Sequence, residues 1–300
     1  MKNPEVSVII PTYKDWPRLA LCLRALEEQS YDRDKFEIIV VNNMPGDEVP
    51  LQLEIPENCR IIEEQKPGSY AARNSALKIC QGRIVGFTDS DCIPDKDWIK
   101  NAVDFLTENP EIERVGGAVE VFSQRAKPSK VELYDEIFAF PQEAYVKSGN
   151  AVTANMFTYK EVFDKIGLFD QSLMSGGDYQ WGKLAQKRGY LIGYAAAAIV
   201  KHPARPTVKE LLTKAKRVGK GQAGFHSSRS QGFLSTLLRV LKILKPRLWE
   251  ARMIFHRGRH LSLERKIYLV LLRHYVVATG DFYRLLYERK RSSSKIQVLP

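Results

Sequence analysis

The sequence predicts an α/β fold: a mixed, mostly parallel sheet flanked by helices, followed by a C-terminal helical extension. Short apolar segments of strand length alternate with segments whose apolar residues recur at helical spacing. This alternation favours parallel strands covered by helices on both faces of the sheet. Polar residues directly follow several strands, at the sheet edge where open α/β folds bind ligands. The chain departs from a plain Rossmann unit, because no Gly-x-Gly-x-x-Gly follows its first strand.

The alternation is clearest in the first 110 residues. Helices are expected to begin at Asp15 and at Ser69, and a third helix is expected over residues 95–106. The strands between them are expected at residues 6–10, 36–41, 60–62 and 84–88. Each strand is therefore followed by enough chain for a crossover to a parallel neighbour.

The pattern is looser after residue 110. Strands are expected at residues 114–122, 151–159 and 190–200, and helices at residues 161–166 and 178–188. Gly189 ends the last of these helices, as glycine commonly does. Residues 129–150 show no clear period and receive no assignment.

The charge is unevenly distributed along the chain, although the total is +11. Residues 1–205 contain 25 basic and 30 acidic side chains, a net charge of −5, whereas residues 206–300 contain 21 and 5, a net charge of +16. We therefore expect two parts, a mildly acidic body over residues 1–205 and a basic helical extension over residues 206–300. The extension indicates an anionic partner, and both membrane lipid and nucleic acid meet this requirement.

The extension contains a predicted amphipathic helix between residues 232 and 245, with Arg239 and Lys242 opposite a leucine face. The leucines are Leu234, Leu237, Leu238, Leu241 and Leu244. This pattern is typical of attachment to an anionic membrane surface, and the alternative is a lid whose leucines pack on the body. A second helix is expected over residues 262–289. Nucleic acid is the disfavoured partner, because stacking aromatics are not interleaved with the basic residues and no binding motif is present.

The cysteines and the N-terminus predict a cytoplasmic location. The four cysteines form no Cys-x-x-Cys pair, so we expect reduced thiols in place of disulfides or a zinc site. They are Cys22, Cys59, Cys80 and Cys92. The N-terminus shows no signal-peptide pattern, and no stretch is apolar for long enough to predict a transmembrane helix. If the extension binds lipid, the protein is peripheral at the inner face of the cell membrane.

Two carboxylates directly follow the apolar segment at residues 84–88: Asp89 and Asp91, with Ser90 between them. A hard divalent cation prefers oxygen ligands and often bridges to a phosphate, so this pair suits Mg²⁺ or a similar ion. The alternative is a polar turn before the next helix, because Asp and Ser favour such positions.

Polar groups at the other strand ends suit a nucleotide diphosphate. In a parallel sheet, most of them would share one edge with the aspartate pair. They are Thr12, Tyr13, Asn42, Asn43 and, after the last strand, His202. Asn42 or Asn43 could bond a base edge, and Arg73 could contact phosphate. His202 could add a ligand to the cation. The alternatives are that Arg73 is a solvated helix charge and that His202 is a polar loop residue.

Asp178 follows a Ser-Gly-Gly sequence at the start of a predicted helix. One interpretation is a helix N-cap, a position that Asp fills well. The other is a general base that faces the ligand from a glycine loop, with the helix dipole favouring its ionised form. The residues alone leave both interpretations open.

Taken together, these segments resemble the family 2 glycosyltransferases, which have the GT-A fold. The matching segments are VSVIIPTY at residues 6–13, FEIIVVNN at 36–43, AARN at 71–74, FTDSD at 87–91, KIGLFD at 165–170, Gly177 with Asp178, and residues 189–202. They occur in the order of the family. The resemblance covers about residues 4–205, and therefore assigns the GT-A domain to the acidic body.

The resemblance implies inverting transfer of a hexosyl or N-acetylhexosaminyl group from a nucleotide-diphosphate sugar to a glycan or lipid-linked glycan, assisted by Mg²⁺ or Mn²⁺. The implied nucleotide-binding residues are Pro11, Thr12, Tyr13, Asn42, Asn43, Arg73, Asp89 and Ser90. Asp89 and Asp91 match the metal motif of the family, with Asp91 as the expected direct ligand, and His202 matches a histidine that can join the metal. Asp178 matches the catalytic base.

The chain departs from the family pattern at two places. Asn42 and Asn43 stand where the family often has Asp, and Gly177 replaces the Glu that usually precedes the base. Three alternatives follow from the residues. They are a nucleotidyltransferase, which also uses paired Asp and a metal but does not need Asp178, a nucleic-acid-binding protein and a non-catalytic nucleotide-sugar-binding protein.

Overall fold

The computed structural model describes residues 4–223, 233–245 and 248–296. Their contacts divide the chain into two compact units, Met1–Phe122 with Phe140–Pro203, and Ser123–Ala139 with Ala204–Pro300. The division expected from the sequence, at residue 205, placed residues 123–139 in the first part. In the structure this segment belongs to the second unit, because its apolar side chains share a core with the helices of the extension.

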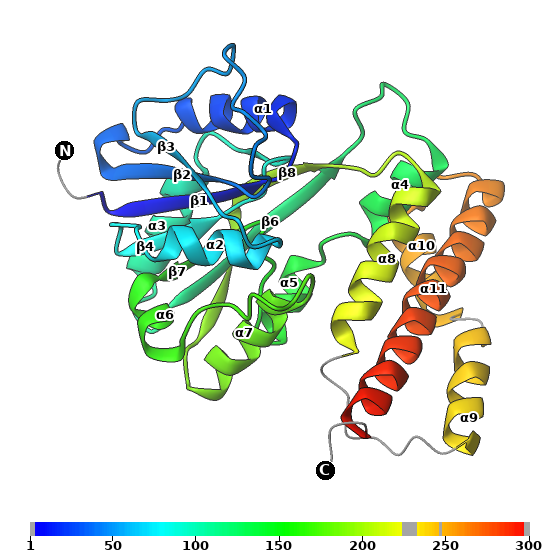
Figure 1. Ribbon diagram of the computed structural model, residues 1–300. Coiled ribbons are helices and arrows are strands. Elements are labelled where there is room, and N and C mark those ends of the chain that lie inside the picture. The colour runs from blue at the N-terminus through cyan, green and yellow to red at the C-terminus, as the bar shows by residue number, and fades with distance from the viewer. Residues whose placement is uncertain (1–3, 224–232, 246–247, 297–300) are drawn as a thin grey trace. The chain divides into compact units, whose positions relative to one another are not determined.

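The first unit is built on a mixed, mostly parallel sheet (Figure 1). The strands are β1 (Val6–Thr12), β2 (Phe36–Asn42), β3 (Cys59–Glu63), β4 (Ile84–Phe87), β5 (Ile93–Pro94), β6 (Arg114–Phe122), β7 (Met156–Tyr159) and β8 (Ile192–Pro203). Their order is β3-β2-β1-β4-β7-β6-β8-β5. The pairs β2–β3, β1–β2, β1–β4 and β6–β8 are parallel, whereas β7 and β5 pair antiparallel with their neighbours. The fold class predicted from the sequence is confirmed.

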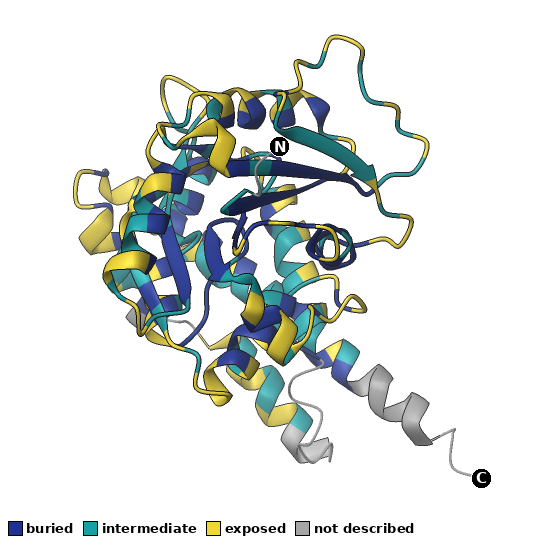
Figure 2. Ribbon diagram, turned by 90° about the vertical axis from the view of Figure 1, so that its left-hand side faces the viewer, coloured by how far each residue is buried: buried dark blue, intermediate teal, exposed yellow. Residues whose placement is uncertain are grey.

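Helices cover both faces of this sheet. They are α1 (Trp16–Glu27), α2 (Ser69–Leu77), α3 (Trp98–Glu108), α5 (Gln142–Lys147), α6 (Lys160–Ile166) and α7 (Gly177–Lys187), with a 3₁₀ turn at Arg33–Lys35. Alternate residues of β1, such as Val6 and Val8, pack with apolar side chains of α1 and α3 in the main core. An aromatic cluster of Phe87, Phe163 and Trp181 joins β4, α6 and α7. The strands β1 and β4 at the centre of the sheet are buried along their whole length (Figure 2).

Three details differ from the sequence expectation. The strand expected over residues 151–159 is formed only by Met156–Tyr159. The unassigned residues 129–150 contain α5 and the second-unit helix α4 (Lys130–Phe138), whose Ser129 and Glu132 form a capping box. The last strand extends beyond residue 200 to Pro203, which brings His202 into the sheet.

The second unit is helical in its described residues. Besides α4 it contains α8 (Val208–Gln222), α9 (Phe233–Leu244), α10 (Leu248–Arg257) and α11 (Leu263–Ile296). Helices α8 and α11 approach so closely that a Cβ at Gly219 would lie 2.2 Å from the Gly280 carbonyl oxygen. The predicted helices at 232–245 and 262–289 correspond to α9 and α11, although Gly232 and the side chain of Leu234 lie outside the described residues.

The leucine face predicted for α9 is exposed where it is described. Leu237, Leu238, Leu241 and Leu244 have between 43% and 63% of their surface exposed. Along α11, Ile267, Leu271 and Tyr275 are likewise exposed. Among the described residues, no helix combines the length and the apolarity needed to cross a membrane.

Candidate active site

The strand-end residues predicted from the sequence converge at the carboxyl edge of β1, β2 and β4. Thr12 lies in register with Asn42 on the neighbouring parallel strand. β4 ends at Phe87, and the backbone N–H of Thr88 still donates to the Ile9 carbonyl of β1, 3.3 Å away. Asp89 therefore leaves the sheet beside the end of β1, at the edge where a ligand of an open α/β sheet binds.

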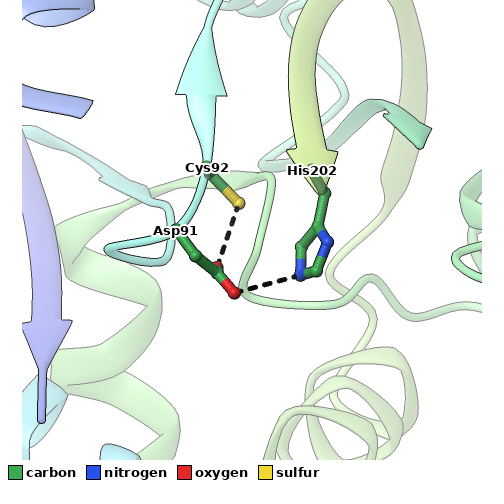
Figure 3. A group of neighbouring side chains, drawn as sticks. All are labelled: Asp91, Cys92 and His202. Carbon is green, nitrogen blue, oxygen red and sulfur yellow. Dashed lines mark hydrogen bonds and ion pairs between the residues drawn. The ribbon is translucent and has the colours of Figure 1, made fainter. Parts of the chain in front are cut away.

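Asp91 and His202 meet through the shortest strand of the sheet. In the antiparallel pair of β5 and β8, Ile93 lies opposite Lys201, so Asp91 and His202 at the adjoining ends face each other (Figure 3). Their Oδ2 and Nε2 atoms are 3.6 Å apart. His202 is buried, and its Nδ1 lies 2.8 Å from the Pro203 carbonyl oxygen. Because a carbonyl only accepts, Nδ1 donates to Pro203, and Nε2 is the ring nitrogen that faces Asp91.

These two side chains fit a divalent cation. Neighbouring ligand atoms of a small octahedral cation lie about 3 Å apart, close to the separation of Asp91 and His202. Cys92 completes the one group of potential ligands found among the described residues. Mg²⁺ and Mn²⁺ prefer oxygen ligands to sulfur, so Cys92, whose buried thiol has a pKa raised well above its usual range, is the disfavoured member. The donor set is then one carboxylate and one imidazole, which leaves positions for the oxygens of a phosphate or water.

Helix α2 holds the first aspartate of the motif, Asp89. The guanidinium of Arg73 forms an ion pair with Asp89 Oδ1. The Arg73 side chain is only 3% exposed, so the alternative of a solvated helix charge is wrong. One residue further on, Asn74 exchanges two hydrogen bonds with the backbone of Phe169, at 2.8 and 3.1 Å. The segment AARN thus joins the end of β4 to the loop that precedes α7.

Asp178 lies in the first turn of α7 and is half-buried. The N-cap of this helix is Gly176, and no side chain caps it, so the interpretation of Asp178 as the N-cap is wrong. Its Oδ1 accepts hydrogen bonds from the Tyr179 backbone N–H at 2.9 Å and from the Tyr70 hydroxyl at 3.0 Å. Tyr70 lies one turn before Arg73 on α2, with the Arg73 guanidinium 5.9 Å from the centroid of its ring. Asp178 and Asp89 are therefore linked through two side chains of one helix.

The two asparagines are engaged by backbone groups. The Asn42 side chain donates to the Asp47 carbonyl oxygen and accepts from the Met44 N–H. The Asn43 side chain donates to the carbonyl oxygens of Glu64 and Lys66 and accepts from the Gly68 N–H. The distances lie between 2.7 and 3.0 Å. Both side chains are buried. They hold the two loops that follow β2 and β3, and direct contact of either amide with a base stays a prediction.

The remaining predicted nucleotide-binding residues differ in exposure. Pro11 and Thr12 are buried, and the Thr12 hydroxyl is buried with no hydrogen-bond partner among the described residues. Tyr13 is 60% exposed, so its ring is free to contact a ligand. Ser90 is mostly buried, with its hydroxyl 3.5 Å from Asp15 Oδ2.

The sequence did not identify two side chains that contact the site. Arg18 on α1 lies with Nη1 3.4 Å from Asp91 Oδ2 and also pairs with Asp15. Tyr70 contacts Asp178 across a separation of 108 residues. Arg18 could have been identified from the sequence, because it lies in the first turn of a helix that follows a polar strand end. Tyr70 had no local signal, because its role depends on the placement of α7.

Comparison with known proteins identifies the class. A family model described as Glycosyl transferase family 2 matches residues 7–167. Glycosyltransferase AglE of Haloferax volcanii is 38% identical over 225 residues, which cover 73% of this chain and 73% of AglE. A dolichyl N-acetyl-α-D-glucosaminyl phosphate 3-β-D-2,3-diacetamido-2,3-dideoxy-β-D-glucuronosyltransferase of Methanococcus voltae is 23% identical over 262 residues, 79% of this chain and 81% of that protein.

The fold agrees with this class. The mannosyltransferase PcManGT from Pyrobaculum calidifontis, solved with GDP-Man and Mn²⁺, superimposes with a TM-score of 0.58 at 20% identity. The match covers 97% of this chain and 87% of PcManGT, and at this identity it establishes a shared fold. Sheet, strand-edge site and relatives together define a GT-A glycosyltransferase. The chain belongs to glycosyltransferase family 2. None of these relatives supports the nucleotidyltransferase or nucleic-acid-binding alternatives.

Proposed function

We propose that this chain is an inverting, metal-assisted glycosyltransferase that moves a hexosyl or N-acetylhexosaminyl group from a nucleotide-diphosphate sugar to a hydroxyl of a glycan or lipid-linked glycan. The observation that carries this proposal is the chain of contacts Asp89–Arg73–Tyr70–Asp178. It joins an edge suited to a diphosphate with a carboxylate suited to proton removal. The relatives support the substrate classes, because one is a glucuronosyltransferase acting on a dolichyl-phosphate sugar and a structural neighbour was solved with GDP-Man.

The proposed reaction assigns a role to each end of this chain of contacts. Asp178 removes the proton of the acceptor hydroxyl as that oxygen attacks the anomeric carbon. The nucleotide diphosphate leaves from the opposite face of the sugar, which inverts the configuration at the anomeric carbon. Arg73 is preorganised by Asp89 and by its burial, so its positive charge is in place where negative charge develops on the diphosphate.

The proposed metal ligands are Asp91 and His202, with Asp89 held nearby by Arg73. A bound Mg²⁺ or Mn²⁺ would act as a Lewis acid toward the diphosphate oxygens. The residues around the cation have complementary tasks in this proposal: Pro203 fixes the His202 tautomer through its carbonyl, and Arg18 orients the Asp91 carboxylate.

A thermal-shift experiment tests the donor class. We expect one nucleoside diphosphate, among UDP, GDP and dTDP, to raise the melting temperature in the presence of Mn²⁺ or Mg²⁺ and much less after chelation. Ligand at a hundred times its Kd stabilises a protein by about 2.7 kcal/mol, which is readily measured. The matched control is the corresponding monophosphate with the same metal. Absence of a shift with every diphosphate and both metals would contradict the proposed function.

We further propose that the second unit attaches the enzyme to an anionic membrane surface, at the cytoplasmic face if the protein is cytoplasmic. Two observations support this surface: the exposed leucines of α9 and the net charge of +16 over residues 206–300. Each basic residue close to anionic lipid contributes about 1 kcal/mol, and apolar side chains add to this by insertion. A peripheral position of this kind would bring the enzyme close to lipid-linked acceptors.

Vesicle flotation tests this attachment. We expect the full chain to float with vesicles rich in phosphatidylserine, to bind less at high salt, and to stay behind with neutral vesicles. The double change Leu241→Ser and Leu244→Ser should reduce binding severalfold. Its matched control is Leu51→Ser with Leu191→Ser, two exposed leucines of the first unit. Equal flotation of both double variants, or none by the native chain, would rule out the leucine face as a membrane anchor.

A further inference from the structure

We propose that Tyr70 is the positioning residue of the catalytic base, and that Gly177 is present because the Tyr70 ring occupies the space of a side chain there. The inference rests on the proposed function of Asp178. It concerns how this chain holds its base where the Glu that usually precedes it in the family is missing.

The contact between Tyr70 and Asp178 joins a buried tyrosine to a half-buried carboxylate. Tyr70 is 5% exposed, and its ring packs against Phe169 with the centroids 5.6 Å apart. The hydroxyl donates to Asp178 Oδ1 at 3.0 Å, and the same oxygen accepts from the Tyr179 N–H at 2.9 Å. Two donors on one oxygen fix the carboxylate plane. In this proposal, Oδ2 is the oxygen that takes the acceptor proton.

Gly177 lies directly beneath the Tyr70 ring. A Cβ at this position would lie 2.8 to 2.9 Å from three ring atoms of Tyr70, closer than carbon atoms approach without contact strain. The ring cannot yield easily, because Phe169 packs against it and Asp178 bonds its hydroxyl. A Glu at residue 177 and a Tyr at residue 70 are therefore incompatible in this arrangement. The departure from the family motif and the Tyr70 contact have one steric explanation.

The phenol is suited to this task throughout the working pH range. Burial and the neighbouring Asp178 carboxylate raise the pKa of Tyr70, so the hydroxyl keeps its proton and remains a donor. The groups around Asp178 are the Tyr70 hydroxyl from α2, the Tyr179 N–H from α7 itself and the Arg73 guanidinium beyond the ring. Because Tyr70 and Arg73 lie on one helix, the position of the base is coupled to the diphosphate side of the site.

The first test is Tyr70→Phe, which removes the donor and keeps the ring. We expect kcat to fall about tenfold to a hundredfold, as misplacement of a catalytic group does, with little change in KM for the donor. Loss of a hydrogen bond to the ionised carboxylate disfavours that form, so the acidic limb of the pH–rate profile should move to higher pH. The matched control is Tyr190→Phe, with the melting temperature measured for both. An unchanged kcat and pH profile in a folded Tyr70→Phe variant would overturn the proposal.

The second test is a double-mutant cycle between residues 70 and 177. Gly177→Ala should lower kcat in the native background by displacing the ring, and should cost little further activity when combined with Tyr70→Ala. Fully additive losses would overturn the steric explanation. Asp178→Asn, measured in parallel, distinguishes failure of the proposed catalytic base from failure of the role proposed for Tyr70. If Asp178→Asn retains activity, the proposed base is wrong, whereas an inactive Asp178→Asn with a fully active Tyr70→Phe removes only the role of Tyr70.

Discussion

Asp178→Asn is expected to reduce kcat by at least about a thousandfold, within the range found for removal of a general base. The amide keeps the size of the side chain and can still accept from Tyr70 and Tyr179 through its oxygen, but it cannot take a proton. Binding of the nucleotide should persist, since Asp178 contacts Tyr70 and the α7 backbone and has no contact with the aspartate pair. Single-turnover kinetics with saturating donor would measure the chemical step directly.

The control for this variant is Asp164→Asn, on the exposed surface of α6. It makes the same chemical change away from the site and should leave kcat within twofold of the native value, as surface substitutions usually do. Equal turnover of Asp178→Asn and the native chain would remove Asp178 from the mechanism. The nucleotidyltransferase alternative, which needs no base at this position, would then have to be considered again.

The polar strand ends were predictable because of how parallel sheets are built. Thr12, Asn42 and Asp89 each follow an apolar run of strand length, and the carboxyl ends of parallel strands meet at one edge. Only the parallel pairing had to be assumed, and the crossover segments between the strands support it. This part of the site thus follows from local patterns alone.

The meeting of Asp91 and His202 depends on a pairing that no local pattern shows. Strand β5 has two residues, too few for a period, and it pairs antiparallel with β8 at the far edge of the sheet. The sequence pattern marked both residues as polar strand-end groups and allowed His202 as a further ligand of the cation, and the family resemblance assigned both to the metal. The separation of 3.6 Å between their ligand atoms supports that pairing without testing the metal itself.

Helix α2 shows most clearly what the spacing of apolar residues cannot predict. The spacing of its small residues predicts a helix and a buried face, but not which polar side chains enter that face. Arg73 and Asn74 are both buried, each paired with a group distant in sequence. Burial of a charge is tolerated because a partner of opposite charge is present, and the sequence cannot reveal that partner before the fold is known.

The two aspartates of the motif are expected to behave differently, which makes the metal proposal testable residue by residue. Asp91→Asn removes the carboxylate that lies beside His202, so we expect the Mn²⁺ concentration for half-maximal turnover to rise at least about a hundredfold. Asp89→Asn keeps this pair but removes the ion-pair partner of Arg73. It should weaken nucleotide binding while leaving the Mn²⁺ requirement within a few-fold of the native value.

Calorimetric titration of Mn²⁺ in the presence of the nucleoside diphosphate gives a readout that does not depend on turnover. Asp91→Asn and His202→Gln should both reduce Mn²⁺ affinity, because each removes one atom of the proposed donor set. Cys92→Ser should leave it unchanged, since Mn²⁺ prefers oxygen and nitrogen ligands to sulfur. If Asp89→Asn alone abolished Mn²⁺ binding, the direct ligand would be Asp89, and the ion pair with Arg73 would have to open when the metal binds.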